Sequence, residues 1–261
     1  MKTILIIILA VLLFAALIAS FLQRKKFLSK EREQEKRDIQ TKQLINHLEH
    51  ELTCVTNFKK TAFNYLAIGN SLTLQGKFEH WWDFVGMAAS TREKDFVHQV
   101  AEHLKTKHKK VVFFPHNFSI WEMQSTDRAR TICCLKKYLS EHIDLITLQL
   151  SENAADTETL AEDMKTLILI LQQRCPRAKI IIVDDFWDDG RSQIKKQVAK
   201  ELSLPFADLS EIRGPKEYMC GMGTIVYDEQ GGAHKVDHEG VAAHPGDKGM
   251  QYIANSIINL L

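Results

Sequence analysis

Short apolar runs alternate with longer amphipathic segments from residue 62 onward, and this alternation most constrains the fold. Buried parallel strands have this apolar character when helices cover both faces of their sheet. Five runs fit it: 63–68, 111–115, 145–150, 179–183 and, more weakly, 205–209. Five segments have helical spacing: 93–108, 127–142, 157–174, 192–202 and 247–260. Their order predicts right-handed crossovers and a three-layer α/β/α sandwich around a parallel, flavodoxin-like sheet.

The N-terminal segment has a different composition. Residues 3–22 carry no charge and consist mainly of large apolar side chains. As a helix, such a run spans the hydrocarbon layer of about 30 Å. A cleaved signal peptide is the alternative, but its apolar region is shorter and ends in a small-x-small site. The sequence therefore predicts a single-pass anchor at 1–23, a polar juxtamembrane stalk helix or linker at 24–60 and a globular domain at 61–261.

Composition limits the function classes. The 261 residues are 45% apolar, enough for one core beside an N-terminal appendage. The formal net charge of +1 supplies no field that would gather nucleic acid, so we expect no nucleic-acid partner. The five cysteines are odd in number and lack CxxC spacing. They predict mostly buried free thiols, neither a full disulfide framework nor a zinc knuckle.

A serine follows the first predicted strand. In a parallel sheet, ligands bind outside the carboxyl ends of the strands, so residues that follow a strand deserve a chemical interpretation. Ser71 stands in Gly-Asn-Ser-Leu-Thr at 69–73, on the turn that leaves the strand. The preceding glycine permits a tight bend and would expose the serine hydroxyl. An ordinary strand-to-helix turn with a capping serine is equally compatible with these residues.

A histidine stands near the other end of the chain. His244 lies in His-Pro-Gly-Asp at 244–247, and Asp247 is expected to cap the helix that follows. An imidazole on such a fixed loop can accept the proton of a serine and return it to a leaving group. Taken alone, such a histidine is more often an ordinary surface-loop residue.

Together these blocks resemble those of the SGNH (GDSL-like) hydrolases. The segment at 69–73 is similar to the first block, with Asn70 where Asp is more usual, and 244–249 is similar to the last. The family places its oxyanion glycine at Gly86 and its oxyanion asparagine at Asn153. The resemblance spans about 63–261. It implies nucleophilic Ser71, base His244, and an oxyanion hole from the Ser71 and Gly86 N–H groups and the Asn153 amide.

The sequence departs from the family where the histidine is oriented. The family usually has Asp three residues before the histidine, but this position is Val241. Asp237 or Glu239 is a candidate orienting acid. A backbone carbonyl that holds the imidazole, leaving a Ser-His dyad, is the alternative that we favour slightly.

Other side chains give weaker signals. The histidines at 234 and 238 with the acids beside them lack the helical spacing of a metal site, so we expect no metal. Four tryptophans and Asn117 lie in or beside the predicted strand-end loops: Trp81, Trp82, Trp121 and Trp187. They fit a carbohydrate platform, but core packing or a lid is the more ordinary role.

The resemblance implies hydrolysis of a carboxylic ester through an acyl-serine, without a cofactor, and an O-acetylated carbohydrate is the first substrate to test. An O-acyltransferase with the same Ser-His pair, or a silent membrane-tethered glycan-binding or scaffold module, is the alternative. The side of the membrane stays open. Arg24, Lys25, Lys26 and Lys30 outweigh Lys2 and favour a cytoplasmic domain, whereas the family commonly works outside the cytoplasm.

Overall fold

The computed structural model describes residues 24–26, 30, 32, 58–124, 127–187 and 190–261. The chain divides into two compact units, Met1–Leu48 and Glu49–Leu261. In the first unit, residues 24–26, 30 and 32 are helical and exposed. The predicted anchor lies outside the described residues, and so does most of the predicted stalk. Among the helices that the structure does describe, none combines the length and the apolar character needed to cross a membrane.

The second unit is built on a parallel sheet of five strands. These are β1 (Phe63–Gly69), β2 (Val111–Asn117), β3 (Leu145–Gln149), β4 (Lys179–Val183) and β5 (Phe206–Ala207). Their spatial order is β2-β1-β3-β4-β5, the flavodoxin-like order. Gly69 at the end of β1 is paired with Asn117 of β2 and Gln149 of β3. The loops that leave these three strands therefore meet at one edge of the sheet.

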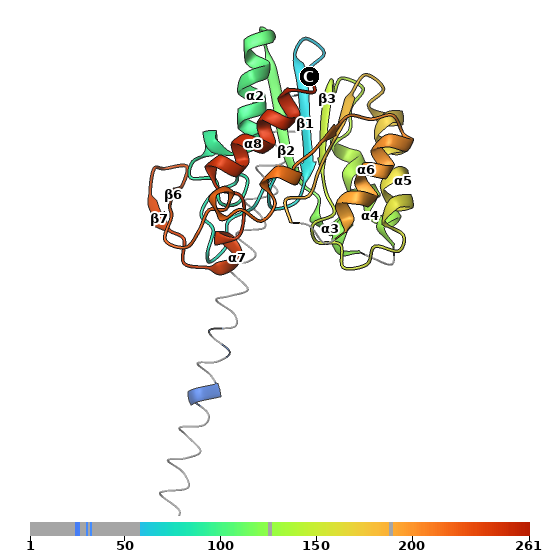
Figure 1. Ribbon diagram of the computed structural model, residues 1–261. Helices are drawn as coiled ribbons and strands as arrows, with labels where there is room; N and C mark the ends of the chain where they lie inside the picture. The colour runs from blue at the N-terminus through green and yellow to red at the C-terminus, as the bar shows by residue number, and fades with distance from the viewer. Residues whose placement is uncertain (1–23, 27–29, 31, 33–57, 125–126, 188–189) are drawn as a thin grey trace, which may run out of the picture. The chain divides into compact units, whose positions relative to one another are not determined.

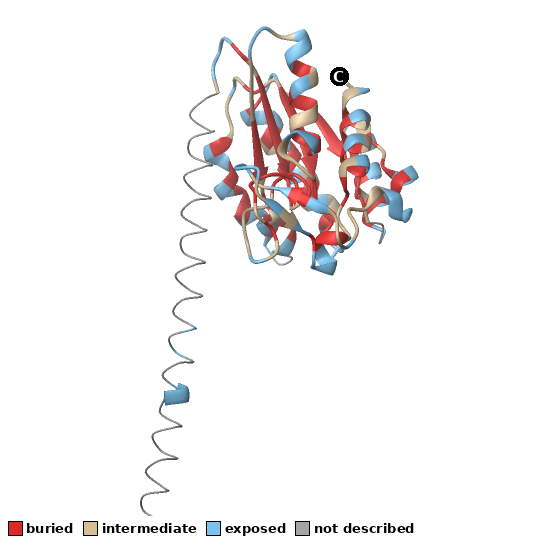
Figure 2. Ribbon diagram, turned by 90° about the vertical axis from the view of Figure 1, so that its left-hand side faces the viewer, coloured by how far each residue is buried: buried red, intermediate tan, exposed pale blue. Residues whose placement is uncertain are grey.

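Helices cover both faces of the sheet (Figure 1). One face packs against α2 (Phe96–Lys107) and α8 (Asp247–Ile258), and the other against α4 (Arg128–Leu135), α5 (Leu160–Arg174) and α6 (Arg191–Glu201). Along β1, Tyr65 and Ala67 point to the first face, while Leu66 and Ile68 point to the second. All four are fully buried, as the red strands of Figure 2 show. The predicted parallel α/β/α sandwich is confirmed.

The predicted helix at 127–142 is shorter in the structure. It ends as α4 at Leu135 and continues as the 3-10 turn η2 (Lys136–Tyr138). This turn brings the Tyr138 ring into the core, with its centroid 4.3 Å from that of His116 on β2. The α-helix ends here because burial of this aromatic ring outweighs the good helix propensity of the two preceding lysines.

Short elements not predicted from the sequence surround the carboxyl edge of the sheet. They are η1 (Arg92–Lys94), α3 (Ser119–Met123), η3 (Ser210–Ile212), η4 (Lys216–Tyr218), β6 (Ile225–Tyr227), β7 (Ala233–Lys235) and α7 (Glu239–Ala242). The β6-β7 hairpin and α7 share a small core with Trp81 and Val85. This core fixes α7, the element directly before His244.

Candidate active site

The turn after β1 presents Ser71 at the edge of the sheet. Gly69 is required there, because a Cβ at this position would lie 2.7 Å from the Gln149 carbonyl oxygen. The Asn70 side-chain oxygen accepts the Leu72 N–H at 3.1 Å, and the Asn70 carbonyl accepts from Thr73 and Leu74. This tight turn leaves the Ser71 side chain partly exposed, while its neighbours on both sides are buried.

The amide at Asn70 has a local explanation. Its Nδ2 donates to Oε1 of the buried Glu122 at 3.0 Å. The aspartate that is more usual here would place a second carboxylate at this distance, away from water. Two buried carboxylates in contact repel unless one is protonated. An amide at Asn70 is thus compatible with the buried Glu122, to which it donates.

His244 contacts Ser71 across 173 positions of the chain: its Nε2 lies 2.9 Å from the serine Oγ. Its Nδ1 lies 2.6 Å from the Gly240 carbonyl oxygen. Since a carbonyl only accepts, Nδ1 carries the hydrogen, and Nε2 presents its lone pair to the serine. The Cys220 N–H donates to the His244 carbonyl at 2.8 Å, which fixes the loop. The imidazole thus has the tautomer that a general base requires.

Burial lowers the pKa of His244 to about 4, and the hydrogen bond to Gly240 opposes this shift only in part. The edge of Trp187 adds to the apolar surroundings, with ring centroids 4.9 Å apart. The imidazole is therefore neutral, and able to accept a proton, at any pH well above 4.

We expect the Cε1 proton of His244 to titrate with a midpoint near pH 4 in NMR spectra, not at the ordinary value of 6.5. The resonance is assigned by its absence from His244→Ala. Because the unfolded chain binds this proton at higher pH, the free energy of unfolding should fall as pH drops from 6.5 to 4, more steeply than in the variant. A midpoint at or above 6.5 would contradict this environment.

The predicted orienting acids do not contact the imidazole. Asp237 lies beside His80, with Oδ1 3.3 Å from Nδ1, and the described contacts of His244 do not include Glu239. Val241, at the family's acid position, is buried in the small core around Trp81. The carbonyl of Gly240 takes the orienting position, which leaves a Ser-His dyad.

Asp247 also differs from its predicted role. The N-cap of α8 is Gly246, and Asp247 is the first helical residue. Its carboxylate accepts from the N–H and the hydroxyl of Ser90, at 2.8 and 2.6 Å. A capping motif in the sequence does not show that another loop will donate to the same carboxylate. Here Asp247 ties the loop that contains Gly86 to α8.

Two of the three predicted oxyanion donors have an N–H group available. Among the described residues, no acceptor binds the Ser71 N–H. The exposed Asn153, in the loop after β3, donates one Nδ2–H to Glu122 Oε2 at 2.6 Å. An amide nitrogen carries two hydrogens, so its second N–H is left for a ligand.

Gly86, the third predicted donor, is engaged elsewhere. Its N–H donates to Asp95 Oδ2 at 3.2 Å, and Asp95 is also the buried N-cap of α2. A Cβ at Gly86 would lie 2.4 Å from the Leu72 carbonyl oxygen. Gly86 therefore packs closely beneath the serine turn, and Asp95 accepts the N–H that the sequence predicted as an oxyanion donor.

A pocket of about 450 Å³ opens over the serine. Its lining comes from several loops at the carboxyl edge: Ser71, Gln75, Met87, Asn117, Ser119, Met123, Asn153, Trp187 and His244. None of these described lining residues is Asp, Glu, Lys or Arg. Of the tryptophans noted in the sequence, Trp81 and Trp121 belong to the core, whereas Trp187 reaches the pocket. The pocket thus favours a neutral ligand.

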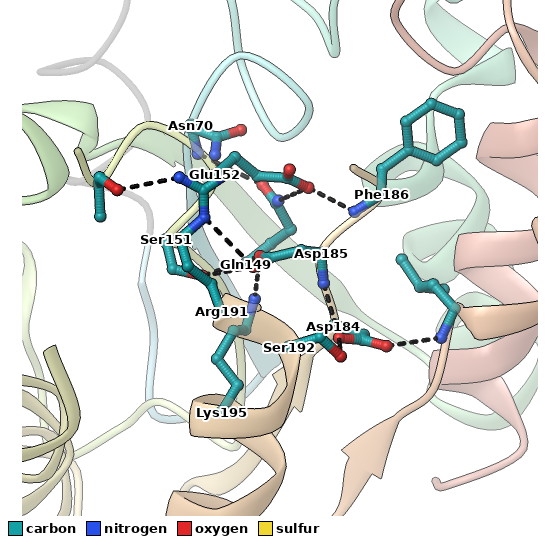
Figure 3. Close-up of polar contacts among 12 residues, drawn as sticks. Asn70, Gln149, Ser151, Glu152, Asp184, Asp185, Phe186, Arg191, Ser192 and Lys195 are labelled. Atoms are coloured by element: carbon teal, nitrogen blue, oxygen red, sulfur yellow. Dashed lines mark hydrogen bonds and ion pairs between the residues drawn. The ribbon is translucent and has the colours of Figure 1, made fainter. Parts of the chain in front are cut away.

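A buried polar network supports the floor of this edge (Figure 3). Lys195 of α6 donates to Asp185 Oδ1 at 2.7 Å, and both side chains are fully buried. Asp185 also accepts the Ser151 hydroxyl at 2.8 Å. Ser151 has φ of 118°, a strained value for a residue with a side chain. Its fixed contacts hold this strained backbone two residues before Asn153.

A second buried acid supports the pocket wall. Glu152 accepts the N–H of Phe186 at 2.5 Å and that of Trp187 at 3.3 Å. Burial, reinforced by the charge of Asp185, raises the pKa of Glu152 well above its usual value. These contacts place the Trp187 ring against His244.

The other histidines noted in the sequence have ordinary partners. His234 Nε2 lies 2.8 Å from Asp228 Oδ2, and its ring stacks on Trp82. His238 stacks on His80 and accepts the Gly240 N–H as the cap of α7. In the described part of the chain, no group of three or more His, Cys, Asp or Glu side chains is arranged to hold a metal ion.

Sequence reasoning missed Glu122 and Glu152, and it expected a backbone carbonyl behind the histidine without identifying Gly240. Glu122 follows β2 at the edge where the predicted site lies, so its position was a usable signal. Its burial could not be predicted, because the sequence does not distinguish a buried glutamate from an exposed one. A backbone carbonyl leaves no signature in residue type at all.

No family model matches the chain, and no curated protein does. Solved structures similar to it include a two-domain esterase active on acetylated mannans, at 16% identity and a TM-score of 0.47, over 80% of this chain and 51% of the esterase. The chain thus spans about half the length of that protein.

Two further structures are similar over nearly their whole length. An acetyl xylan esterase from Geobacillus stearothermophilus has 13% identity and a TM-score of 0.48, over 77% of this chain and 96% of the esterase. A structure described as a GDSL-like lipase, from Parabacteroides merdae ATCC 43184, has 13% identity and a TM-score of 0.46, over 78% and 96%. The chain is thus similar to solved structures of esterases and of a GDSL-like lipase.

Proposed function

We propose that the chain is a serine esterase of the SGNH (GDSL-like) type that cleaves a carboxylic ester through an acyl-serine. The carrying observation is the 2.9 Å contact between Ser71 Oγ and His244 Nε2, with the tautomer fixed by Gly240. A nucleophile, a base and a group that orients the base are the parts that acyl transfer requires.

In the first half-reaction, Ser71 Oγ attacks the ester carbonyl while its proton moves to His244 Nε2. The carbonyl oxygen becomes an oxyanion that accepts hydrogen bonds from the Ser71 N–H and the free Asn153 N–H. Such preset donors stabilise the transition state more than the bound ester. When the C–O bond breaks, His244 returns the proton to the leaving alcohol, and the acyl group stays on Ser71.

In the second half-reaction, a water molecule takes the place of the alcohol. His244 Nε2 accepts its proton, the hydroxide oxygen attacks the acyl carbon, and the same donors hold the second oxyanion. The proton then returns to Ser71 Oγ as the carboxylic acid leaves. A sugar hydroxyl in place of water would make the same site an O-acyltransferase.

The pocket lining supports a neutral ester. Gln75, Asn117 and Ser119 offer amide and hydroxyl groups, and Trp187 offers an aromatic edge. Amides, hydroxyls and aromatic rings suit the hydroxyl-rich, uncharged surface of a carbohydrate. An O-acetylated carbohydrate is therefore the substrate class that we propose.

The proposal also includes a single-pass membrane anchor, because residues 3–22 carry no charge and are long enough to span the bilayer as a helix. The side of the membrane on which the enzyme acts is left open.

The test is turnover of p-nitrophenyl acetate by the full chain in detergent micelles. We expect steady release of p-nitrophenol well above the buffer rate, without added metal or cofactor. Product analysis with an added acceptor sugar then separates acetate release from acetyl transfer. If p-nitrophenol is not released with or without the acceptor, the proposal is wrong, and the silent binding or scaffold module is the alternative that remains.

A further inference from the structure

A buried glutamate lies directly behind the proposed oxyanion site. Glu122 is on α3, the short helix that follows β2, and its side chain has no exposed area. It is absent from the residues that line the pocket, so it does not touch a ligand there. Its neighbour Trp121 is buried as well and anchors α3 in the core.

Glu122 receives three hydrogen bonds from two catalytic loops. Oε1 accepts from Asn70 Nδ2 at 3.0 Å and from the Ser151 N–H at 2.5 Å. Oε2 accepts from Asn153 Nδ2 at 2.6 Å. One carboxylate thus connects the serine turn after β1 with the asparagine loop after β3.

The three donors match the ionised form of the acid. Burial raises the pKa of Glu122, and the hydrogen bonds from Asn153, Asn70 and Ser151 oppose that shift. A carboxylate offers only acceptors, so it can bind the Asn153 amide only through nitrogen. The reversed amide would place the Asn153 oxygen against the buried carboxylate oxygen, so that two acceptors would meet with no proton between them.

We propose that Glu122 is a positioning residue that fixes the Asn153 amide with its second N–H directed toward the oxyanion. The inference rests on the proposed esterase function. Asn153 is exposed at the pocket and would otherwise turn its amide either way at little cost. With Glu122 behind it, the donor is set before the substrate arrives, which is the condition for efficient oxyanion stabilisation.

The matched test is Glu122→Gln. Its oxygen can keep the contacts of Oε1, since the Ser151 N–H cannot turn round, and this leaves the new NH₂ group facing Asn153. The Asn153 amide must then reverse and present oxygen to the site. We expect kcat for p-nitrophenyl acetate to fall by about 10²- to 10³-fold, the effect of losing one oxyanion donor, with KM little changed. Glu141→Gln, on an exposed side chain, should match wild type.

A double-mutant cycle separates positioning from a general structural role. If Glu122 acts through Asn153, Glu122→Gln should lower kcat by less than about threefold in an Asn153→Ala background, because the donor is already gone. Losses that multiply in the double variant overturn the inference. The inference is also overturned if Glu122→Gln keeps the wild-type kcat while Asn153→Ala is strongly impaired.

The proposed function fails in a different way. It fails if wild type is inactive or if Asn153→Ala and Ser71→Ala leave turnover unchanged, whatever Glu122→Gln does. A charge exchange tests the contact itself without activity. Asn153→Asp alone places two acids together and should lower Tm, and adding Glu122→Gln should restore Tm because the new amide donates to Asp. Equal Tm for the single and the double variant overturns the inference, even where Glu122→Gln alone does not fold.

Discussion

Replacing His244 by alanine is expected to lower kcat/KM for p-nitrophenyl acetate by at least about 10⁴-fold, and Ser71→Ala by as much. Each change removes one half of the 2.9 Å contact that makes the serine a nucleophile. Neither removes core packing, because both side chains lie at the pocket. Thermal unfolding followed by circular dichroism should give Tm values close to wild type.

The double variant provides an internal check. Residues that act as one unit are not additive, so Ser71→Ala with His244→Ala should be no slower than either single variant. His142→Ala changes a partly exposed histidine that contacts no pocket residue and should keep wild-type kcat/KM. A kcat/KM of His244→Ala within about tenfold of wild type would show that His244 is not the general base.

The second large effect is on stability. Lys195→Met is expected to lower the free energy of unfolding by about 3–5 kcal/mol, the usual cost of removing one partner of a buried ion pair. Lys195 and Asp185 have no exposed side-chain area and meet at 2.7 Å. Methionine fills a similar volume, so the loss comes from an uncompensated carboxylate, not from a cavity. Urea unfolding followed by fluorescence measures it.

The next residue supplies a matched control. Lys196 pairs with Asp208 at the same distance of 2.7 Å, but the two side chains are 52% and 40% exposed. Lys196→Met should therefore cost at most about 1 kcal/mol. Adding Asp185→Asn to Lys195→Met should recover part of the lost stability, because the remaining buried charge is gone. Equal costs for the two lysines would contradict the assignment of a buried pair.

The sheet and its helices were predictable because burial leaves a periodic signal. The runs at 63–68 and 145–150 are apolar on both faces, and the structure has β1 and β3 there. The β6-β7 hairpin was not predictable in this way. Its strands have three residues each, too few for alternation to be recognised.

The site was predictable to the extent that its chemistry depends on residue type and strand order. Ser71 and His244 meet because β1 is central in the sheet and the loop before α8 returns to the same edge. Gly86 shows the limit of this reasoning, since Asp95 takes its N–H. The residues that orient the site, Glu122 and Gly240, act through burial and backbone geometry, which no single letter records.

No acid in the described part of the chain contacts His244, and this has a physical consequence. An acid beside the histidine fixes its tautomer and stabilises the imidazolium that forms during reaction. The Gly240 carbonyl performs the first task by accepting from Nδ1. It carries no full charge for the second, in agreement with the low pKa of His244. A dyad of this kind depends more strongly on the oxyanion donors, and therefore on Asn153 and Glu122.

The most direct test of the Ser71-His244 account is covalent labelling with a fluorophosphonate, followed by peptide mass spectrometry. This reagent phosphonylates a serine whose proton is taken by a neighbouring base. The account predicts that Ser71 alone is modified in wild type, that Ser71→Ala is not labelled, and that His244→Ala is labelled far more slowly. An unmodified Ser71, or equal labelling rates in wild type and His244→Ala, would contradict it.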